Sequence, residues 1–230
     1  MELEEAEAEQ VLRWAYSRFR RVAVVASFQA ESTVLIDMAA RIVDEPEVVT
    51  LDTGRLPQET HDQIDRELAA HRLRLHVQAP DPGEVGPLVA EHGSNGFRRS
   101  VEVRRLCCEI RKARPLARAL EGFDAWVTGL RRGQARSRAA TPVVAVDPLH
   151  GGIAKIAPLA RWSGAEVWDY IRGRGLGYHE LHDRGYPSIG CAPCTRAVAE
   201  GEDPRAGRWW WEQEEVRECG LHWSPEAALS

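Results

Sequence analysis

The feature that most constrains the fold is a regular alternation of short apolar strands with amphipathic helices early in the chain. Residues 21–26 (RVAVVA) are predicted to form a buried strand, because apolar residues follow one another without polar alternation. We predict a helix over 33–43, a second strand over 48–51, and a helix and strand at about 58–71 and 73–77. This order predicts an α/β fold with a doubly wound, mainly parallel sheet.

The other predicted elements fit the same architecture. They are an amphipathic helix over 3–19, a helical stretch over 101–121 interrupted near Pro115, a strand over 125–128, a hairpin of 143–146 with 153–157, and a helix from 163 to about 171. Mostly loops are expected beyond Gly173. The 230 residues suit one sizeable domain, and no linker forces a second, so we expect a single domain over 1–230.

Two turns follow the first two predicted strands, Ser27–Ser32 and Asp52–Arg55. Ligands of parallel sheets collect at the carboxyl ends of the strands, where both turns would lie. The first turn precedes a helix, whose N-terminal N–H groups suit an anion. It is neither a Walker motif nor a Gly-x-Gly-x-x-Gly fingerprint, so alone it indicates little.

Four of the five cysteines form two pairs, Cys107-Cys108 and Cys191/Cys194. The Cys-x-x-Cys pair is compatible with zinc, an iron–sulfur cluster or dithiol redox chemistry. Adjacent side chains on a helix diverge by about 100°, so the tandem pair suits a polyhedral cluster better than one small ion. The pattern favours an iron–sulfur cluster over zinc, and buried core cysteines remain an alternative.

Arg111 and Lys112 follow the tandem cysteines at four-residue spacing, on the same faces of a regular helix. Their charges would lower thiol pKa values and offset the charge of a thiolate-bound cluster, unless both are simply solvated. The fifth cysteine, Cys219, lies in Glu-Cys-Gly-Leu-His. By its chemistry alone it is either a nucleophile or a stray thiol.

Two arginine-bearing loops, Gly129–Arg132 and Pro204–Arg208, offer guanidinium groups that match phosphate or sulfate oxygens. Solvated arginines are the alternative. Residues 209–211 form a run of three tryptophans, which could stack on a nucleobase but more often serve a core or an interface.

The net charge of −5 argues against nonspecific nucleic-acid binding. No apolar run approaches the length of a membrane span, and the acidic start is unlike a signal peptide. We therefore expect a cytoplasmic protein without a nucleic-acid or membrane partner, in which clustered cysteines serve as metal ligands or redox groups rather than as disulfides.

Together these motifs resemble the sulfonucleotide reductase family, in particular its assimilatory adenylyl-sulfate (APS) reductases that carry a [4Fe–4S] cluster. The likeness spans roughly residues 20–222 in motif order. Besides the two turns and the cysteine pairs, it rests on Thr128–Arg132, Ser188–Thr195, Gly201–Trp211 and Glu218–His222. The resemblance implies a fold of the adenine-nucleotide alpha-hydrolase-like (pyrophosphatase-loop) type, with residues of about 205–230 forming a mobile active-site segment.

The resemblance also implies a reaction and its residues. A cysteine thiolate attacks the sulfur of adenosine 5′-phosphosulfate (APS), AMP leaves, and reduced thioredoxin or glutaredoxin releases sulfite from the cysteine thiosulfonate. Carried over by motif, Cys219 is the nucleophile and one [4Fe–4S] cluster is held by Cys107, Cys108, Cys191 and Cys194. The implied substrate-binding residues are Ser27, Thr53, Lys112, Arg131, Arg205, Arg208 and Trp209.

Three alternatives stay open. Phosphoadenylyl-sulfate (PAPS) reductases share the fold and the terminal cysteine motif, although their usual members lack the cluster pairs, and dual APS/PAPS specificity is a variant of this alternative. A tRNA-thiolation enzyme would need a double glycine that the turn after the first strand lacks. A non-enzymatic iron–sulfur or zinc sensor would make Cys219 incidental. Gln29 and Ser32 depart from the family's usual residues, and the sequence leaves the oligomeric state open.

Overall fold

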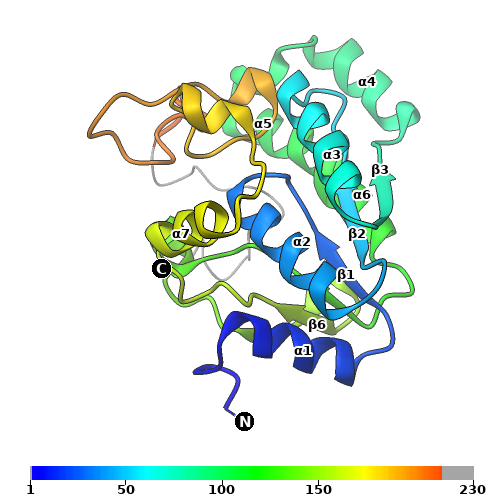
Figure 1. The fold of residues 1–230 in the computed structure, drawn as a ribbon. Helices are drawn as coiled ribbons and strands as arrows, with labels where there is room; N and C mark the ends of the chain where they lie inside the picture. Colours follow the sequence, from blue (N-terminus) through cyan, green and yellow to red (C-terminus); the bar gives the residue numbers. More distant parts are fainter. Residues whose placement is uncertain (1, 214–230) are drawn as a thin grey trace.

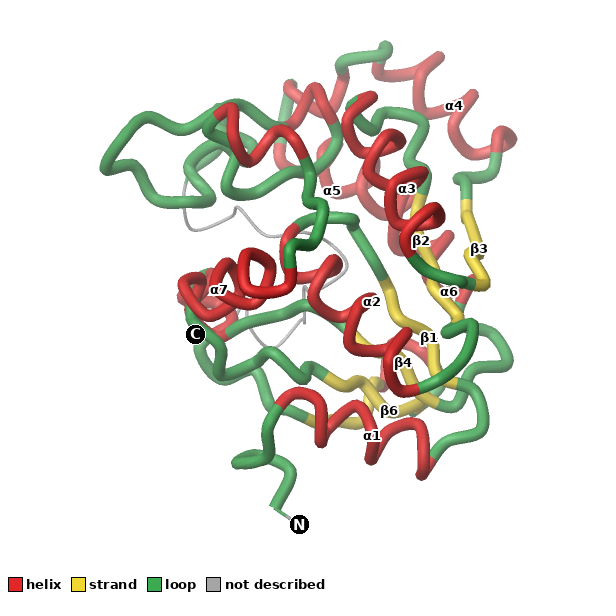
Figure 2. The backbone as a smooth tube through the Cα atoms, in the orientation of Figure 1, coloured by secondary structure: helices red, strands yellow, loops and turns green. Residues whose placement is uncertain are grey.

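The computed structural model describes residues 2–213 and arranges them as a sheet with helices on both faces (Figure 1). The helices are α1 (Ala8–Arg18), α2 (Ala30–Ile42), α3 (Gln58–Ala70), α4 (Pro82–His92), α5 (Val101–Cys108), α6 (Arg114–Ala119) and α7 (Gly164–Arg174). The strands are β1 (Val22–Val25), β2 (Glu47–Leu51), β3 (Arg74–Gln78), β4 (Ala125–Val127), β5 (Val144–Asp147) and β6 (Ile153–Ile156). Most of the chain after α7 is loop (Figure 2).

The described strands form one sheet in the order β3-β2-β1-β4-β6-β5. All neighbours are parallel except β5 and β6, which form an antiparallel hairpin. The predicted mainly parallel sheet and the predicted hairpin are therefore confirmed. The chain moves outward from β1 through β2 to β3 and then returns to place β4 on the other side of β1. This change of direction creates a switch point between β1 and β4, the usual ligand position in such sheets.

Strand β1 shows how sequence produces the two layers. Val22 and Val24 pack with helices α1, α2 and α7 on one face, whereas Ala23 packs with α6 on the other. Because both faces are covered, the strand has no polar positions, as its sequence predicts. The described residues contain no helix long and apolar enough to cross a membrane.

Helix α4 was not predicted from the sequence, because its segment is rich in proline and glycine. It is started by Asp81, whose carboxylate accepts the Gly83 N–H at 2.8 Å, and by Pro82, which fits the first turn. Helix α1 begins at Ala8 rather than residue 3, because the Gln10 side chain accepts the Glu7 N–H there.

The predicted break in the 101–121 helix lies before Pro115, as a π-helical turn over Glu109–Ala113. Proline cannot donate the next backbone hydrogen bond, which favours a widened turn ahead of it. The helix is thus not regular between the tandem cysteines and the pair Arg111 and Lys112. The prediction that these residues share helix faces assumed a regular helix.

Glu67 is a buried carboxyl that should make the free energy of unfolding depend on pH. It accepts hydrogen bonds from Thr33 Oγ1 and Gln63 Nε2, both at 2.9 Å, yet burial raises its pKa to about 7. A raised folded-state pKa stabilises at low pH, and this contribution is lost as pH rises through about 7. At pH 8 we expect the free energy of unfolding of Glu67→Gln, measured by urea titration, to exceed that of the parent by roughly 2–3 kcal/mol. Near pH 4 the two free energies should be equal.

The matched control is Glu91→Gln, whose side chain is 76% exposed and should change stability by less than about 0.5 kcal/mol. A pH-independent difference between Glu67→Gln and the parent would contradict the assignment.

Candidate active site

The functional candidate is a cavity of about 410 Å³ at the carboxyl ends of the parallel strands. It spans the switch point, with β1 in the middle, β2 on one side and β4 on the other. Of the residues predicted from the sequence to bind substrate, those that line it are Ser27, Thr53, Lys112, Arg131, Arg205 and Arg208. Residues from Ser27 to Arg208 thus meet in one cavity.

The cysteines gather at the β2 side of this cavity. Cys191 lines it, and its Sγ lies 3.2 Å from Thr53 Oγ1 in the turn after β2. Cys107 is close enough to Cys191, and Cys194 to both Cys191 and Cys108, for the thiol charges to interact. The fold therefore brings the two sequence pairs together.

Burial raises the pKa of two of these thiols, Cys107 and Cys194. It raises the pKa of Cys107, and burial with the neighbouring Cys191 raises the pKa of Cys194 to about 12, against the opposing charge of Lys112. Among residues 2–213, no three His, Cys, Asp or Glu side chains converge tightly enough to hold a single metal ion.

Cationic side chains surround the thiols. Arg111 donates Nη1 to the Thr53 carbonyl at 2.7 Å and still interacts with Cys107 despite the π-turn. Arg208 is held by Ser188 Oγ at 3.2 Å and the Ile189 carbonyl at 3.0 Å, both through Nη1. Its Nε is buried and has no hydrogen-bond partner among the described residues. An unsatisfied buried donor beside a cavity is suited to an anionic ligand.

Trp209 lies behind the cavity instead of at its wall. Its ring is 1% exposed and stacks between the guanidinium groups of Arg104 and Arg208, each 4.7 Å from the ring centroid. It also packs against Cys108, and the backbone N–H of Trp209 donates to the Cys194 carbonyl at 3.2 Å. Its φ of 45° is unusual for a large side chain, so this packing holds a strained residue in place.

The sequence analysis did not identify the pair that anchors this stack. Arg104 and Glu212 form a bidentate ion pair at 2.9 and 2.8 Å, with side chains 1% and 4% exposed. The two residues are 108 positions apart, so no local pattern links them. The pair joins the cysteine helix α5 to the segment that carries Arg205 and Arg208.

We expect Arg104→Ala to lower the free energy of unfolding by roughly 3–5 kcal/mol, because the buried Glu212 carboxylate loses its guanidinium. Urea titration measures the change. Arg72→Ala, which removes a 71%-exposed arginine, should cost less than about 0.5 kcal/mol. Equal small effects in both variants would show that the buried pair does not support the fold.

The turn after β1 is closed by side chains as well as backbone. Gln29 donates Nε2 to Ser27 Oγ at 2.9 Å and accepts the Ile189 N–H at 2.7 Å through Oε1. The residue that departs from the family pattern therefore ties this turn to the segment that leads into Cys191. The Ala30 N–H, in the first turn of α2, donates to His182 Nε2 at 3.3 Å.

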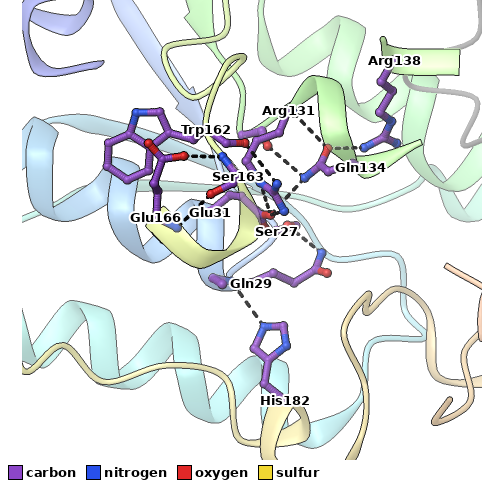
Figure 3. A network of polar contacts seen from close by, with 12 residues as sticks. Ser27, Gln29, Glu31, Arg131, Gln134, Arg138, Trp162, Ser163, Glu166 and His182 are labelled. Atoms are coloured by element: carbon purple, nitrogen blue, oxygen red, sulfur yellow. Dashed lines mark hydrogen bonds and ion pairs between the residues drawn. The ribbon is translucent and has the colours of Figure 1, made fainter. Parts of the chain in front are cut away.

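In the predicted anion-binding loop after β4, Arg131 lines the cavity and Arg132 does not. Arg131 faces the cavity, but it is paired with Glu31, with Nε and Nη2 at 2.9 and 2.8 Å from Oε1 (Figure 3). Arg132 binds the Thr141 carbonyl at 2.9 Å and Glu4 at 2.7 Å, and it is not among the residues that line the cavity. The predicted nucleophile, Cys219, and the rest of the predicted active-site segment beyond residue 213 lie outside the described residues.

The mainly parallel sheet with a cavity at its switch point is a doubly wound α/β fold, and its solved neighbours have the adenine-nucleotide alpha-hydrolase-like form of it. FMN adenylyltransferase of Candida glabrata, solved with FAD and inorganic pyrophosphate, has this fold, with a TM-score of 0.60 at 13% identity over 92% of this chain and 75% of that one. At that identity the likeness concerns the fold alone.

The family follows from closer likenesses. The model of the phosphoadenosine phosphosulfate reductase domain matches residues 21–197. An adenosine 5′-phosphosulfate reductase of Allochromatium vinosum is 46% identical over 218 residues, 95% of this chain and 85% of that protein. The phosphoadenylyl-sulfate reductase of Candida auris, solved as a phosphate complex, is 30% identical with a TM-score of 0.72, over 86% of this chain and 93% of that one. The chain belongs to the phosphoadenosine phosphosulfate reductase domain family.

Proposed function

We propose that this protein reduces adenosine 5′-phosphosulfate to sulfite and AMP in assimilatory sulfate reduction and cysteine biosynthesis. The observation that carries the proposal is the cavity at the carboxyl ends of the parallel strands, in which Lys112, Arg205 and Arg208 lie with Cys191. The named reductase of Allochromatium vinosum, similar over most of both chains, supports the same substrate.

The proposed reaction has two steps. The Cys219 thiolate attacks the sulfate sulfur, an S–S bond forms, and the S–O bond to the phosphate breaks, so that AMP leaves with the electron pair. A thiolate of a reduced dithiol protein, thioredoxin or glutaredoxin, then attacks Cys219 and sulfite leaves. The second donor thiol resolves the mixed disulfide, which returns Cys219 as a thiolate and oxidises the donor by two electrons.

In this proposal the chain's cations stabilise the charge that develops during attack. Arg208, whose buried Nε has no hydrogen-bond partner among residues 2–213, lines the cavity together with Lys112 and Arg205. Fixed donors of this kind need no reorganisation as the leaving phosphate gains charge. The apolar side of the cavity, which includes Val25, Leu51 and Trp126, suits an adenine ring.

The four gathered thiols fit a [4Fe–4S] cluster. They come from two segments and lie beside Arg111 and Lys112, whose charges would offset bound thiolates. In the proposal Cys107, Cys108, Cys191 and Cys194 hold the cluster. When bound, it supplies structure and local electrostatics, while the dithiol donor supplies both electrons.

The test uses protein purified without oxygen. Its visible absorption is recorded, and sulfite release is assayed from APS and from PAPS with reduced thioredoxin and, separately, with glutaredoxin. Broad iron–sulfur absorption and sulfite from APS are expected. No sulfite from either nucleotide would overturn the reductase proposal, and no visible absorption would overturn the cluster.

PAPS is the second candidate substrate, favoured by the 30% identity to the Candida auris reductase. The same assay separates the two candidates by the ratio of their kcat/KM values.

A further inference from the structure

The cavity proposed to bind a dianionic substrate also contains a carboxylate. Among the described residues, those that line the cavity include the cations Lys112, Arg131, Arg138, Arg205 and Arg208. Glu31 is the only acidic residue of this described lining. A carboxylate disfavours anions nearby, so its presence needs a reason.

Glu31 is held in a defined position. Its Oε1 accepts from Arg131 Nε at 2.9 Å, Arg131 Nη2 at 2.8 Å and Gln134 Nε2 at 3.0 Å (Figure 3). Gln134 is itself oriented by the Arg131 N–H at 3.1 Å and Arg138 Nη1 at 2.7 Å, both of which donate to its Oε1. Gly129 packs so closely that an added Cβ would lie 2.8 Å from Glu31 Cβ.

The other oxygen of this carboxylate is available to a ligand. Oε2 accepts no hydrogen bond from any residue that the structure describes, and the Glu31 side chain is only 18% exposed. A half-satisfied carboxylate at a cavity wall is an acceptor for a hydroxyl group.

Topology places Glu31 away from the sulfur chemistry. The thiols lie on the β2 side, where Cys191 contacts Thr53. Gly129 follows the end of β4, and Glu31 lies in the first turn of α2, the helix that follows the end of β1. A nucleotide with its base on the apolar wall near Trp126 and its phosphosulfate at Lys112 and Arg208 would carry its ribose past these ends.

We propose that Glu31 determines which nucleotide the site accepts. Its Oε2 accepts a hydrogen bond from a ribose hydroxyl, and its charge disfavours a nucleotide that carries a 3′-phosphate there. This inference rests on the proposed function and extends it, because it explains a preference for APS over PAPS. The same logic operates where an acidic residue on the ribose hydroxyl selects NAD over NADP.

The neighbouring arginines make the prediction testable in both directions. Arg131 shares its charge with Glu31, and Arg138 reaches the network through Gln134. If Glu31 becomes neutral, these guanidinium groups would favour a 3′-phosphate.

The test variant is Glu31→Gln, which keeps an oxygen for Arg131 and Gln134 and replaces Oε2 by an amide donor. We expect KM for APS to rise roughly tenfold, because a hydrogen bond to a charged group is worth about 10- to 100-fold in affinity. The kcat for APS should stay within about threefold, since the ribose contact is made equally in the ground and transition states. The ratio of kcat/KM for APS to that for PAPS should fall at least about tenfold.

Glu166→Gln is the matched control. Glu166 also acts electrostatically on Arg131, but it is engaged by the Ser163 N–H at 2.7 Å and does not line the cavity. It should leave the APS/PAPS ratio unchanged. Melting temperatures establish that both variants are folded.

A binding experiment separates ribose recognition from catalysis. Titration calorimetry with AMP, 2′-deoxy-AMP and 3′-deoxy-AMP should show one deoxy analogue binding at least about tenfold more weakly to the parent. Glu31→Gln should lose most of that difference.

The outcomes distinguish the two proposals. Parent protein that releases no sulfite from either nucleotide contradicts the proposed function. Parent protein that reduces APS, with an unchanged APS/PAPS ratio in folded Glu31→Gln, contradicts only the role of Glu31. Equal kcat/KM values of the parent protein for PAPS and APS would also contradict the role of Glu31.

Discussion

Replacement of Cys219 by serine is expected to lower sulfite release from APS by at least about a thousandfold, because a serine hydroxyl is a far weaker nucleophile than a thiolate at neutral pH. The cluster absorption should stay unchanged, since the four proposed ligands are all retained. Mass spectrometry provides a second readout. Parent protein incubated with APS without a dithiol donor should gain the mass of an SO₃ group, and Cys219→Ser should not.

Cys191→Ser serves as the opposite case. It removes a thiol that interacts with Cys107 and Cys194, so visible absorption should be lost. If Cys219→Ser were the bleached variant, or if it still released sulfite at the parent rate, the division of the cysteines into four ligands and one nucleophile would be wrong.

The second large effect is expected at Arg208. Arg208→Ala should lower kcat/KM for APS by about 100- to 1000-fold, the usual consequence of removing one fixed donor from a developing oxyanion. The geometry supports this size, because the guanidinium lines the cavity and is held in place through Nη1 by Ser188 and Ile189. Steady-state sulfite assays give the value, and Arg208→Lys should recover part of it by restoring the charge.

Arg132→Ala is the control, since Arg132 is engaged by Thr141 and Glu4 and is not among the lining residues. It should change kcat/KM by less than about threefold, because it loses no contact at the cavity. Gly190→Ala tests position without removing the guanidinium, because its Cβ would lie 2.3 Å from Arg208 Nη2. Full activity in both Arg208→Ala and Gly190→Ala would exclude Arg208 from the reaction.

Much of the fold could be predicted because its signals are local. The uninterrupted apolar run of β1 needs no partner to be recognised as a buried strand, and Ser163 with Glu166 forms the capping box that the sequence predicts at the start of α7. Helix α4 was not predicted because Pro87 lowers helix propensity inside the segment, whereas the cap at Asp81 and Pro82 in the first turn favour the helix.

The candidate site was less predictable, because side-chain pairing depends on distant residues. The sequence around Arg131 does not indicate whether its guanidinium binds a substrate or pairs with Glu31. Only the fold shows the ion pair of Arg131 with Glu31. The burial of Trp209 between two arginines also requires α5 and the last described loop to meet.

The sequence by itself determined the class of sheet, the membership of the family and the types of side chain that a reductase site needs. It could do so because periodicity and motif spacing are properties of neighbouring residues. Only the tertiary structure decided how these side chains are placed: which arginines line the cavity, how the cysteine pairs meet, and that Glu31 contacts the described residues through Oε1 alone. Those outcomes depend on distances between residues such as Glu31 and Arg131, which lie 100 positions apart and are brought together by the order of the strands.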